Sequence, residues 1–147
     1  MERYEHTQRG TWLMAIWGLN VLRVLIGIKR KGLTAGRCLA LSVNVLMLVA
    51  FSNLQVVVDD EALVLRFKPG FVSRRLPLSE IESCAVVSNR WYWGWGVRLT
   101  PHGTLYNVGG LRAVEVRLQS GRRVRVGSDE PERLAEAVRA GLAATAA

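Results

Sequence analysis

The chain has 147 residues, of which 50% are hydrophobic and 22% are charged, and its formal net charge is +8. This length suits one domain with a short appendage. The two cysteines and two histidines lie far apart in the sequence. Their spacing argues against a disulfide framework or a zinc site, so we expect neither a metal nor a cofactor.

The positive charge is concentrated between two apolar runs. Residues 29–37 carry a charge of +4 without any acidic residue, whereas residues 54–147 carry +3 from thirteen basic and ten acidic residues. A nucleic-acid-binding protein is expected to carry its basic patch on the folded domain. We therefore expect no nucleic-acid partner.

The two apolar runs follow residues 1–10, which we expect to form an N-terminal tail. Thr11–Ile28 has 18 residues and would span about 27 Å as a helix, close to the hydrocarbon thickness of a bilayer. Cys38–Leu54 has no charge in 17 residues. Neither run has the polar stripe of an amphipathic helix. Residues 11–54 are therefore predicted to form a transmembrane hairpin with a basic loop at 29–37; the alternative is a soluble hairpin buried in a larger assembly.

Three polar residues lie inside the predicted spans, namely Asn20, Arg23 and Asn44. An arginine at the centre of a span costs roughly 2.5–3.5 kcal/mol, although the Arg23 side chain can extend toward the basic end of the helix. Asn20 and Asn44 would lie at a similar depth in an antiparallel hairpin. We expect them to hydrogen-bond to each other or to contact a partner chain, since polar groups inside spans are functional candidates.

From Gln55 onward the hydrophobic pattern changes to the alternation of half-buried strands. Ile81–Ser88 is predicted as a strand with Ile81, Ser83, Ala85 and Val87 on one face. In the last hairpin, Glu115 is expected to pair with an arginine of the returning strand. The other predicted strands are Glu61–Phe67, Phe71–Leu78, a segment around Val97 and Leu99, Ala113–Leu118 and Arg123–Val126.

One helix is predicted after the last strand. Asp129 is a good N-cap residue, and Glu132 occupies the capping-box position. Leu134, Val138 and Leu142 then form an apolar stripe that can dock on a sheet. The fold class is therefore α+β: a two-helix transmembrane hairpin, then an antiparallel β-barrel or sandwich over residues 55–143 with one C-terminal helix.

The segment Pro77–Pro131 resembles small bacterial membrane proteins of the pleckstrin-homology-like (PH-like) type. Its features are P-L-x-E-I at Pro77–Ile81, G-W-G at Gly94–Gly96, Tyr106-Asn107, a V-E-V-R-L strand, and G-R-R-x-R-x-G before an acidic, proline-containing helix start. The resemblance covers most of residues 54–142. It implies a seven-stranded, partly open barrel that the C-terminal helix caps at one end.

Eukaryotic relatives of that group bind phosphoinositides through basic residues in and beside the first hairpin loop. The corresponding basic residues of this chain are Arg66, Lys68, Arg74 and Arg75. They lack the K-x(n)-R-x-R pattern, so we do not transfer phosphoinositide binding. We retain these four residues as candidates for contact with anionic lipid or with a protein partner.

The most distinctive local segment is Arg90–Gly96, which has four aromatic residues in five positions. Arg90, Trp91, Trp93 and Trp95 would suit a loop that lies against lipid headgroups. The alternative is that the three alternating tryptophans form a ridge of the core, which we favour for at least one of them.

No residues of this chain assemble a nucleophile, a base and an orienting group. We therefore expect no enzymatic activity, no catalytic residue and no small-molecule substrate. The sequence favours an integral protein of a bacterial cytoplasmic (inner) membrane. It would present a PH-like domain for protein binding, self-assembly or contact with anionic lipid. The alternative is a subunit of a transport or envelope-maintenance complex in which the hairpin is the working part.

The basic loop favours a cytoplasmic loop by the positive-inside rule, and the arginines that flank the other ends of the spans favour the opposite orientation. Cys84 has no obvious partner for a disulfide, which favours a reducing compartment for the β domain. We therefore expect the β domain to be cytoplasmic.

Overall fold

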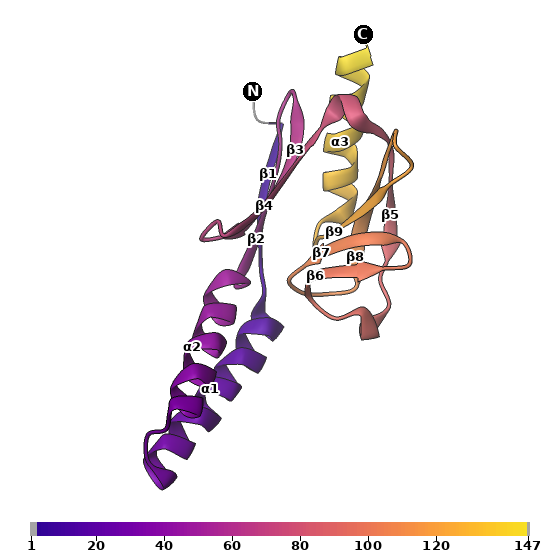
Figure 1. Ribbon diagram of the computed structural model, residues 1–147. Coiled ribbons are helices and arrows are strands. Elements are labelled where there is room, and N and C mark those ends of the chain that lie inside the picture. Colours follow the sequence, from indigo (N-terminus) through magenta and orange to yellow (C-terminus); the bar gives the residue numbers. More distant parts are fainter. Residues whose placement is uncertain (1–2, 147) are drawn as a thin grey trace.

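The structure of the protein is a computed structural model, and it describes residues 3–146. The architecture is α+β, as expected: a hairpin of two N-terminal helices, two β-sheets and a C-terminal helix (Figure 1). The helices are α1 (Thr11–Lys31), α2 (Ala35–Ala50) and α3 (Pro131–Ala146), with short 3₁₀ helices at Leu78–Glu80 and Trp91–Trp93.

The strands form one sheet of four strands and one of five. The first sheet has the order β1-β2-β3-β4 and is antiparallel throughout. The second has the order β5-β8-β9-β7-β6 and contains one parallel pair, β7 with β9. The strands are β1 (Tyr4–Arg9), β2 (Asn53–Val58), β3 (Ala62–Lys68), β4 (Val72–Pro77), β5 (Ile81–Ser88), β6 (Gly96–Thr100), β7 (Gly103–Asn107), β8 (Arg112–Leu118) and β9 (Arg123–Gly127).

Strand β1 lies in the segment that the sequence suggested was a tail. It pairs with β2 along its whole length, from Tyr4 opposite Val58 to Arg9 opposite Asn53. Sequence patterning missed it because its inward side carries polar groups; Gln8, for example, is buried and donates from Nε2 to the carbonyl of Gly109. The hairpin is thus inserted between two paired strands. The β domain is built from β1 together with the chain after α2, not from residues 55–143 alone.

The boundaries of the hairpin differ from the predicted ones. α1 is the longer helix, because the three basic residues after Ile28 form its last turn. α2 begins earlier than predicted, with Thr34 as its N-cap, and ends at Ala50. Leu54 belongs to β2, and its side chain is fully buried in the core of the β domain. The predicted loop 29–37 therefore shrinks to residues 32–34.

Among the described residues, α1 is the helix that is long and apolar enough to cross a membrane, and α2 is a shorter apolar helix. A signal sequence near an N-terminus can be as apolar as α1, so length and hydropathy alone are weak evidence for a span. None of the apolar window of α1 is buried within the chain, which distinguishes it from an ordinary core helix.

The core lies between the inner faces of the two sheets, and α3 closes it at one end (Figure 1). Leu134 and Val138 of the predicted stripe are fully buried, whereas Leu142 is only partly covered. The sheets contribute mainly leucine and valine side chains from alternate positions. These are Leu54, Val56, Val58, Leu63, Leu65 and Leu76 from the first sheet and Val114, Val116, Val124 and Val126 from the second, with Phe67 as the largest.

Two separate sheets fit the sandwich alternative, but they differ from the seven-stranded barrel that the resemblance implies, and one strand pair is parallel. After β7, Asn107 closes a tight turn: its Oδ1 accepts from the N–H of Gly109 and its Nδ2 donates to the carbonyl of Gly110. The chain then crosses to pair β8 with β5, and β9 fills the space between β8 and β7. β9 runs antiparallel to β8 on one side and parallel to β7 on the other.

Two local predictions are also corrected. The pairing of β5 with β8 shifts between Ile81 and Ser83, so Cys84 lies opposite the inward Val116 and the predicted face through Ser83 is wrong. The predicted N-cap is wrong as well, because α3 begins at Pro131. Asp129 instead bonds the His6 ring at 2.7 Å, which ties β1 to the start of α3.

Candidate functional site

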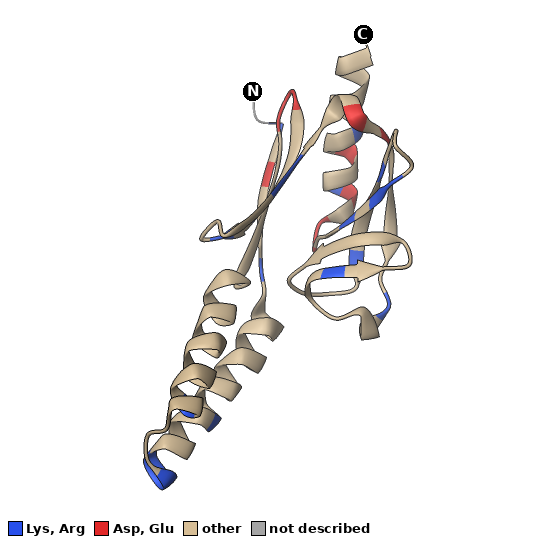
Figure 2. Ribbon diagram, in the orientation of Figure 1, with Lys and Arg blue, Asp and Glu red and all other residues tan. Residues whose placement is uncertain are grey.

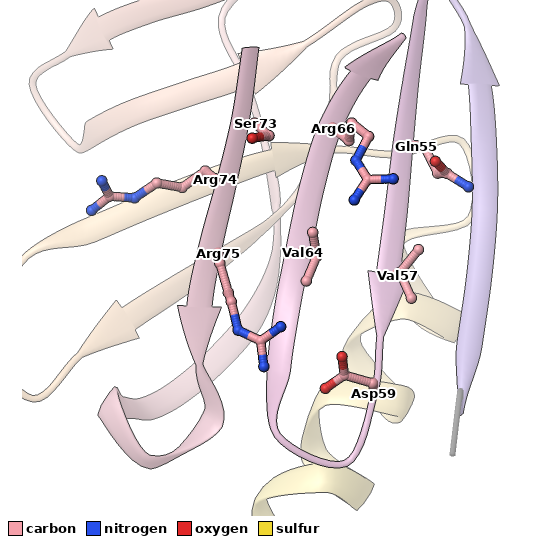
Figure 3. A pocket seen from close by; sticks show the side chains of 8 residues that line it. All are labelled: Gln55, Val57, Asp59, Val64, Arg66, Ser73, Arg74 and Arg75. Carbon is pink, nitrogen blue, oxygen red and sulfur yellow. The ribbon is translucent and has the colours of Figure 1, made fainter. Parts of the chain in front are cut away.

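A groove crosses the outer face of the first sheet (Figure 3). Strand register places Arg66 of β3 between Gln55 of β2 and Ser73 of β4, and places Arg75 opposite Val64. Figure 3 shows the Arg66 and Arg75 side chains lying over this face. The groove therefore combines two guanidinium groups with an apolar floor of Val57 and Val64.

The other two basic residues of the predicted quartet do not join this pair. Arg74 borders the groove, but because side chains alternate along a strand, its guanidinium extends away from Arg75 (Figure 3). Lys68 ends β3 and lines a different recess, together with Met14 of α1 and Val49 of α2. The four basic residues that the sequence grouped thus serve two separate surfaces.

The groove is not uniformly positive. The Glu61 carboxylate pairs with Arg75 at 2.8 Å, and Asp59 lies at one end of the groove. The backbone N–H groups of Glu61 and Ala62 donate to Asp59 at 2.8 and 2.6 Å, and these bonds hold the pKa of Asp59 below its usual range. Asp59 is therefore ionised at neutral pH. Such mixed charge fits a polar or zwitterionic partner better than a multiply phosphorylated headgroup.

The tryptophan-rich segment forms a 3₁₀ helix instead of a strand, so its tryptophans do not form one ridge. Trp91 is 77% exposed. Trp93 covers the guanidinium of Arg125, 5.2 Å from its ring centroid. Trp95 packs against the core. The core interpretation is thus supported for Trp95, and Trp91 remains free for contact with lipid or a partner. Arg90 donates to the Tyr92 hydroxyl at 2.9 Å.

Beneath Trp93 lies a buried ion pair on the outer face of the second sheet. Glu115 of β8 stands opposite Arg125 of β9, as expected, and their Oε2 and Nε atoms are 2.7 Å apart. Arg125 also donates to Asn89 Oδ1 at 3.3 Å. Its side chain is only 8% exposed. The pairing could be predicted from the sequence, but its burial could not, because the cover comes from the irregular segment that precedes β6.

Large apolar side chains are exposed at the end of the β domain nearest the hairpin. Phe71 follows the β3–β4 turn and is 69% exposed, and Leu99 of the edge strand β6 is 90% exposed. With Trp91 they form what we call the apolar rim. The turn and the start of β6 both line recesses with α1 and α2, and β6 lies at the helix-proximal end of the domain (Figure 1). Phe71 and Leu99 were not predicted as contact residues, because their alternation suggested burial.

The three polar residues of the hairpin share one recess between α1 and α2, together with Arg37. Asn44 donates from Nδ2 to the carbonyl of Ala40 in its own helix at 2.7 Å. Among the described residues no hydrogen bond joins it to Asn20, so the predicted bond across the hairpin is wrong. The Asn44 donor is thus bonded within its own helix, although both asparagines line the same recess.

Comparison of the sequence with models of protein families and with curated proteins finds no match. The geometry of residues 3–146 therefore provides the evidence for function. Within that range no group of three or more His, Cys, Asp or Glu side chains is placed to hold a metal ion.

Proposed function

We propose that this protein is a non-enzymatic integral membrane protein whose α1–α2 hairpin crosses a bacterial cytoplasmic membrane and holds the β domain against its surface. One observation carries the proposal: the apolar side chains of the hairpin point outward. The exposed ones are Trp12, Met14, Ile16, Leu19, Leu22, Leu25 and Ile26 of α1 and Leu39, Val43, Val45, Leu46 and Val49 of α2.

Water is a poor environment for such a surface. Burying one large aliphatic or aromatic side chain is worth about 1.5–3 kcal/mol, and soluble monomers rarely expose contiguous apolar patches above a few hundred Å². The polar groups Asn20 and Asn44 lie instead on the partly covered side, between the helices. A lipid environment accounts for this apolar exterior.

The apolar rim supports the position of the β domain. Trp91 and Phe71 are exposed, and Phe71 follows the turn at Lys68 and Pro69 that lines a recess with α1 and α2; Arg90 precedes Trp91 in the chain. Aromatic side chains favour the lipid–water interface, and basic residues favour anionic headgroups there. Held in this way, the β domain would act as a binding or assembly module, with the Arg66–Arg75 groove available to a protein partner or to a second copy.

A second candidate function is favoured by the recess that holds Asn20, Arg23 and Asn44. Polar side chains inside a membrane mark pathways or interfaces. In this alternative the hairpin is the working part of a transport or envelope-maintenance complex, and the β domain only anchors it.

Membrane integration predicts that the full chain stays in the pellet after alkaline carbonate extraction and floats with liposomes. Leu22→Lys combined with Leu46→Lys should move it to the supernatant, since each charge costs roughly 2.5–3.5 kcal/mol near the centre of a span. Leu33→Lys, in the short loop between the helices, is the matched control and should not change the fractionation. A wild-type chain that carbonate releases would refute membrane integration.

The proposed cytoplasmic orientation of the β domain is supported by its free thiol. Cys84 Sγ lies 3.6 Å from the carbonyl of Ala135, and burial against α3 raises its pKa. An unpaired cysteine suits a reducing compartment.

This orientation predicts the accessibility of the loop. In a chain without Cys38 and Cys84, Leu33→Cys should react with a membrane-impermeant maleimide in intact cells. Arg122→Cys, on the β8–β9 turn, should react only after lysis. The reverse pattern would place the β domain outside the cytoplasm while leaving membrane integration intact.

A further inference from the structure

We infer that the recess between α1 and α2 binds the phosphate group of an anionic phospholipid, an inference that rests on the proposed membrane insertion. The recess is open and has a volume of about 470 Å³. Arg23 comes from α1, Arg37 comes from the first turn of α2, and Asn20 and Asn44 lie deeper. Arginine binds phosphate oxygens through paired N–H donors.

Small residues keep the recess open between the two guanidinium groups. Gly27 lies one turn after Arg23, and a Cβ atom built on it would stand 3.8 Å from Arg37 Nε. Gly36 also lines the recess. A larger side chain at Gly27 would fill the space beside the Arg37 guanidinium, where a ligand oxygen can now approach.

The chain supplies no counter-charge for these arginines. No acidic residue occurs between Glu5 and Asp59. Within residues 3–146, no ion pair involves Arg23 or Arg37. Two like charges that share one recess repel each other, and an anion placed between them removes that repulsion. An anion from another molecule would supply the missing counter-charge.

Arg37 is held in place before any ligand binds. Its Nη1 donates to the backbone carbonyls of Lys31 and Gly32, which are exposed at the end of α1. A guanidinium has five donor hydrogens, so donors remain for a ligand. Holding the group in advance reduces the entropic cost of binding.

The position of the recess favours a lipid as the source of the phosphate. Arg37 lies at the end of the hairpin that is distant from the β domain, where Lys29, Arg30 and Lys31 form a blue cluster in Figure 2. In a bilayer, this end of the hairpin would reach the lipid phosphates of the leaflet on the side opposite the β domain. Basic pockets between transmembrane helices bind anionic headgroups, and the Arg23 side chain can extend toward them from within the hydrocarbon.

The test uses the full chain in mild detergent, titrated with phosphatidylglycerol, with phosphatidylcholine of the same acyl chains, or with inorganic phosphate. Native mass spectrometry and thermal unfolding report binding. We expect retained phosphatidylglycerol and a raised unfolding midpoint, with little effect of phosphatidylcholine. Arg23→Gln should weaken the binding of phosphatidylglycerol about tenfold, since it removes a charge-assisted contact.

Arg122→Gln is the matched control, because it removes the same charge from an exposed position on the β8–β9 turn, outside the hairpin. It should change the affinity less than twofold. Equal losses in both variants, or equal binding of the two lipids, would overturn the inference, as would full protection by inorganic phosphate. A chain that carbonate does not extract but that shows no lipid selectivity would refute this inference alone and leave membrane integration standing.

Discussion

Glu115→Gln is expected to destabilise the β domain by about 3 kcal/mol, because it leaves the charge of Arg125 buried without its counter-ion. The Arg125 guanidinium lies under the Trp93 ring and cannot turn to water without moving the segment that covers it. Chemical unfolding of the full chain, followed by tryptophan fluorescence, measures the change.

Two controls separate burial from simple charge removal. Glu82→Gln removes the partner of Arg117 in an exposed ion pair of 3.2 Å and should cost less than about 1 kcal/mol. The double variant Glu115→Leu with Arg125→Met should recover most of the lost stability, since apolar groups of similar size replace a buried ion pair at little cost. If Glu115→Gln reduced the stability no more than Glu82→Gln does, the Glu115–Arg125 ion pair would be accessible to water.

Gly103→Ala is expected to cost about 3 kcal/mol or more, because the new methyl group would meet rigid backbone. A Cβ atom at Gly103 would lie 2.0 Å from the carbonyl oxygen of Arg123 in β9, and Gly103 has a φ of +107°. β7 starts here beside β9 in the parallel pair. The clash would push the two strands apart at the point where the sheet is held by a few pairings.

Gly121→Ala isolates the effect of the backbone conformation. Gly121 also has a positive φ, of +80°, but nothing lies within 4 Å of its Cβ position. This variant should show only the cost of a left-handed alanine, about 1–3 kcal/mol. Thermal unfolding of both variants measures the difference between their losses of stability. Equal losses would show that β7 and β9 can move apart to accommodate the methyl group at no energetic cost.

The sequence predicted those elements whose pattern is local. The stripe of Leu134 and Val138 identified α3, and the predicted strand Ile81–Ser88 matches the bounds of β5, although its predicted face was wrong. It missed β1, because a strand with Gln8 on its buried side has no apolar alternation. It missed the parallel pairing of β7 with β9, since residues 103–107 contain nothing that specifies which distant strand they will join.

The contact residues show the same limit. Arg66 and Arg75 meet because strand register places them on one face, whereas Lys68 lies beyond the last pairing that faces the groove. Trp93 was grouped with Trp91 by composition, yet it is held over Arg125, thirty-two positions further along the chain. Residue type therefore suggested candidate contact residues, and tertiary pairing determined which of them lie together.

The junction between the hairpin and the first sheet has a consequence for biogenesis. The N–H of Gly10 donates to the carbonyl of Ser52 at 2.7 Å, so the entry to α1 and the exit from α2 are joined by the same ladder that pairs β1 with β2. In the proposed membrane protein, β1 is synthesised first and must wait on its side of the bilayer until both helices have been inserted. A chain with only one helix inserted would leave β1 and β2 on opposite sides, so completion of the sheet selects correctly inserted chains.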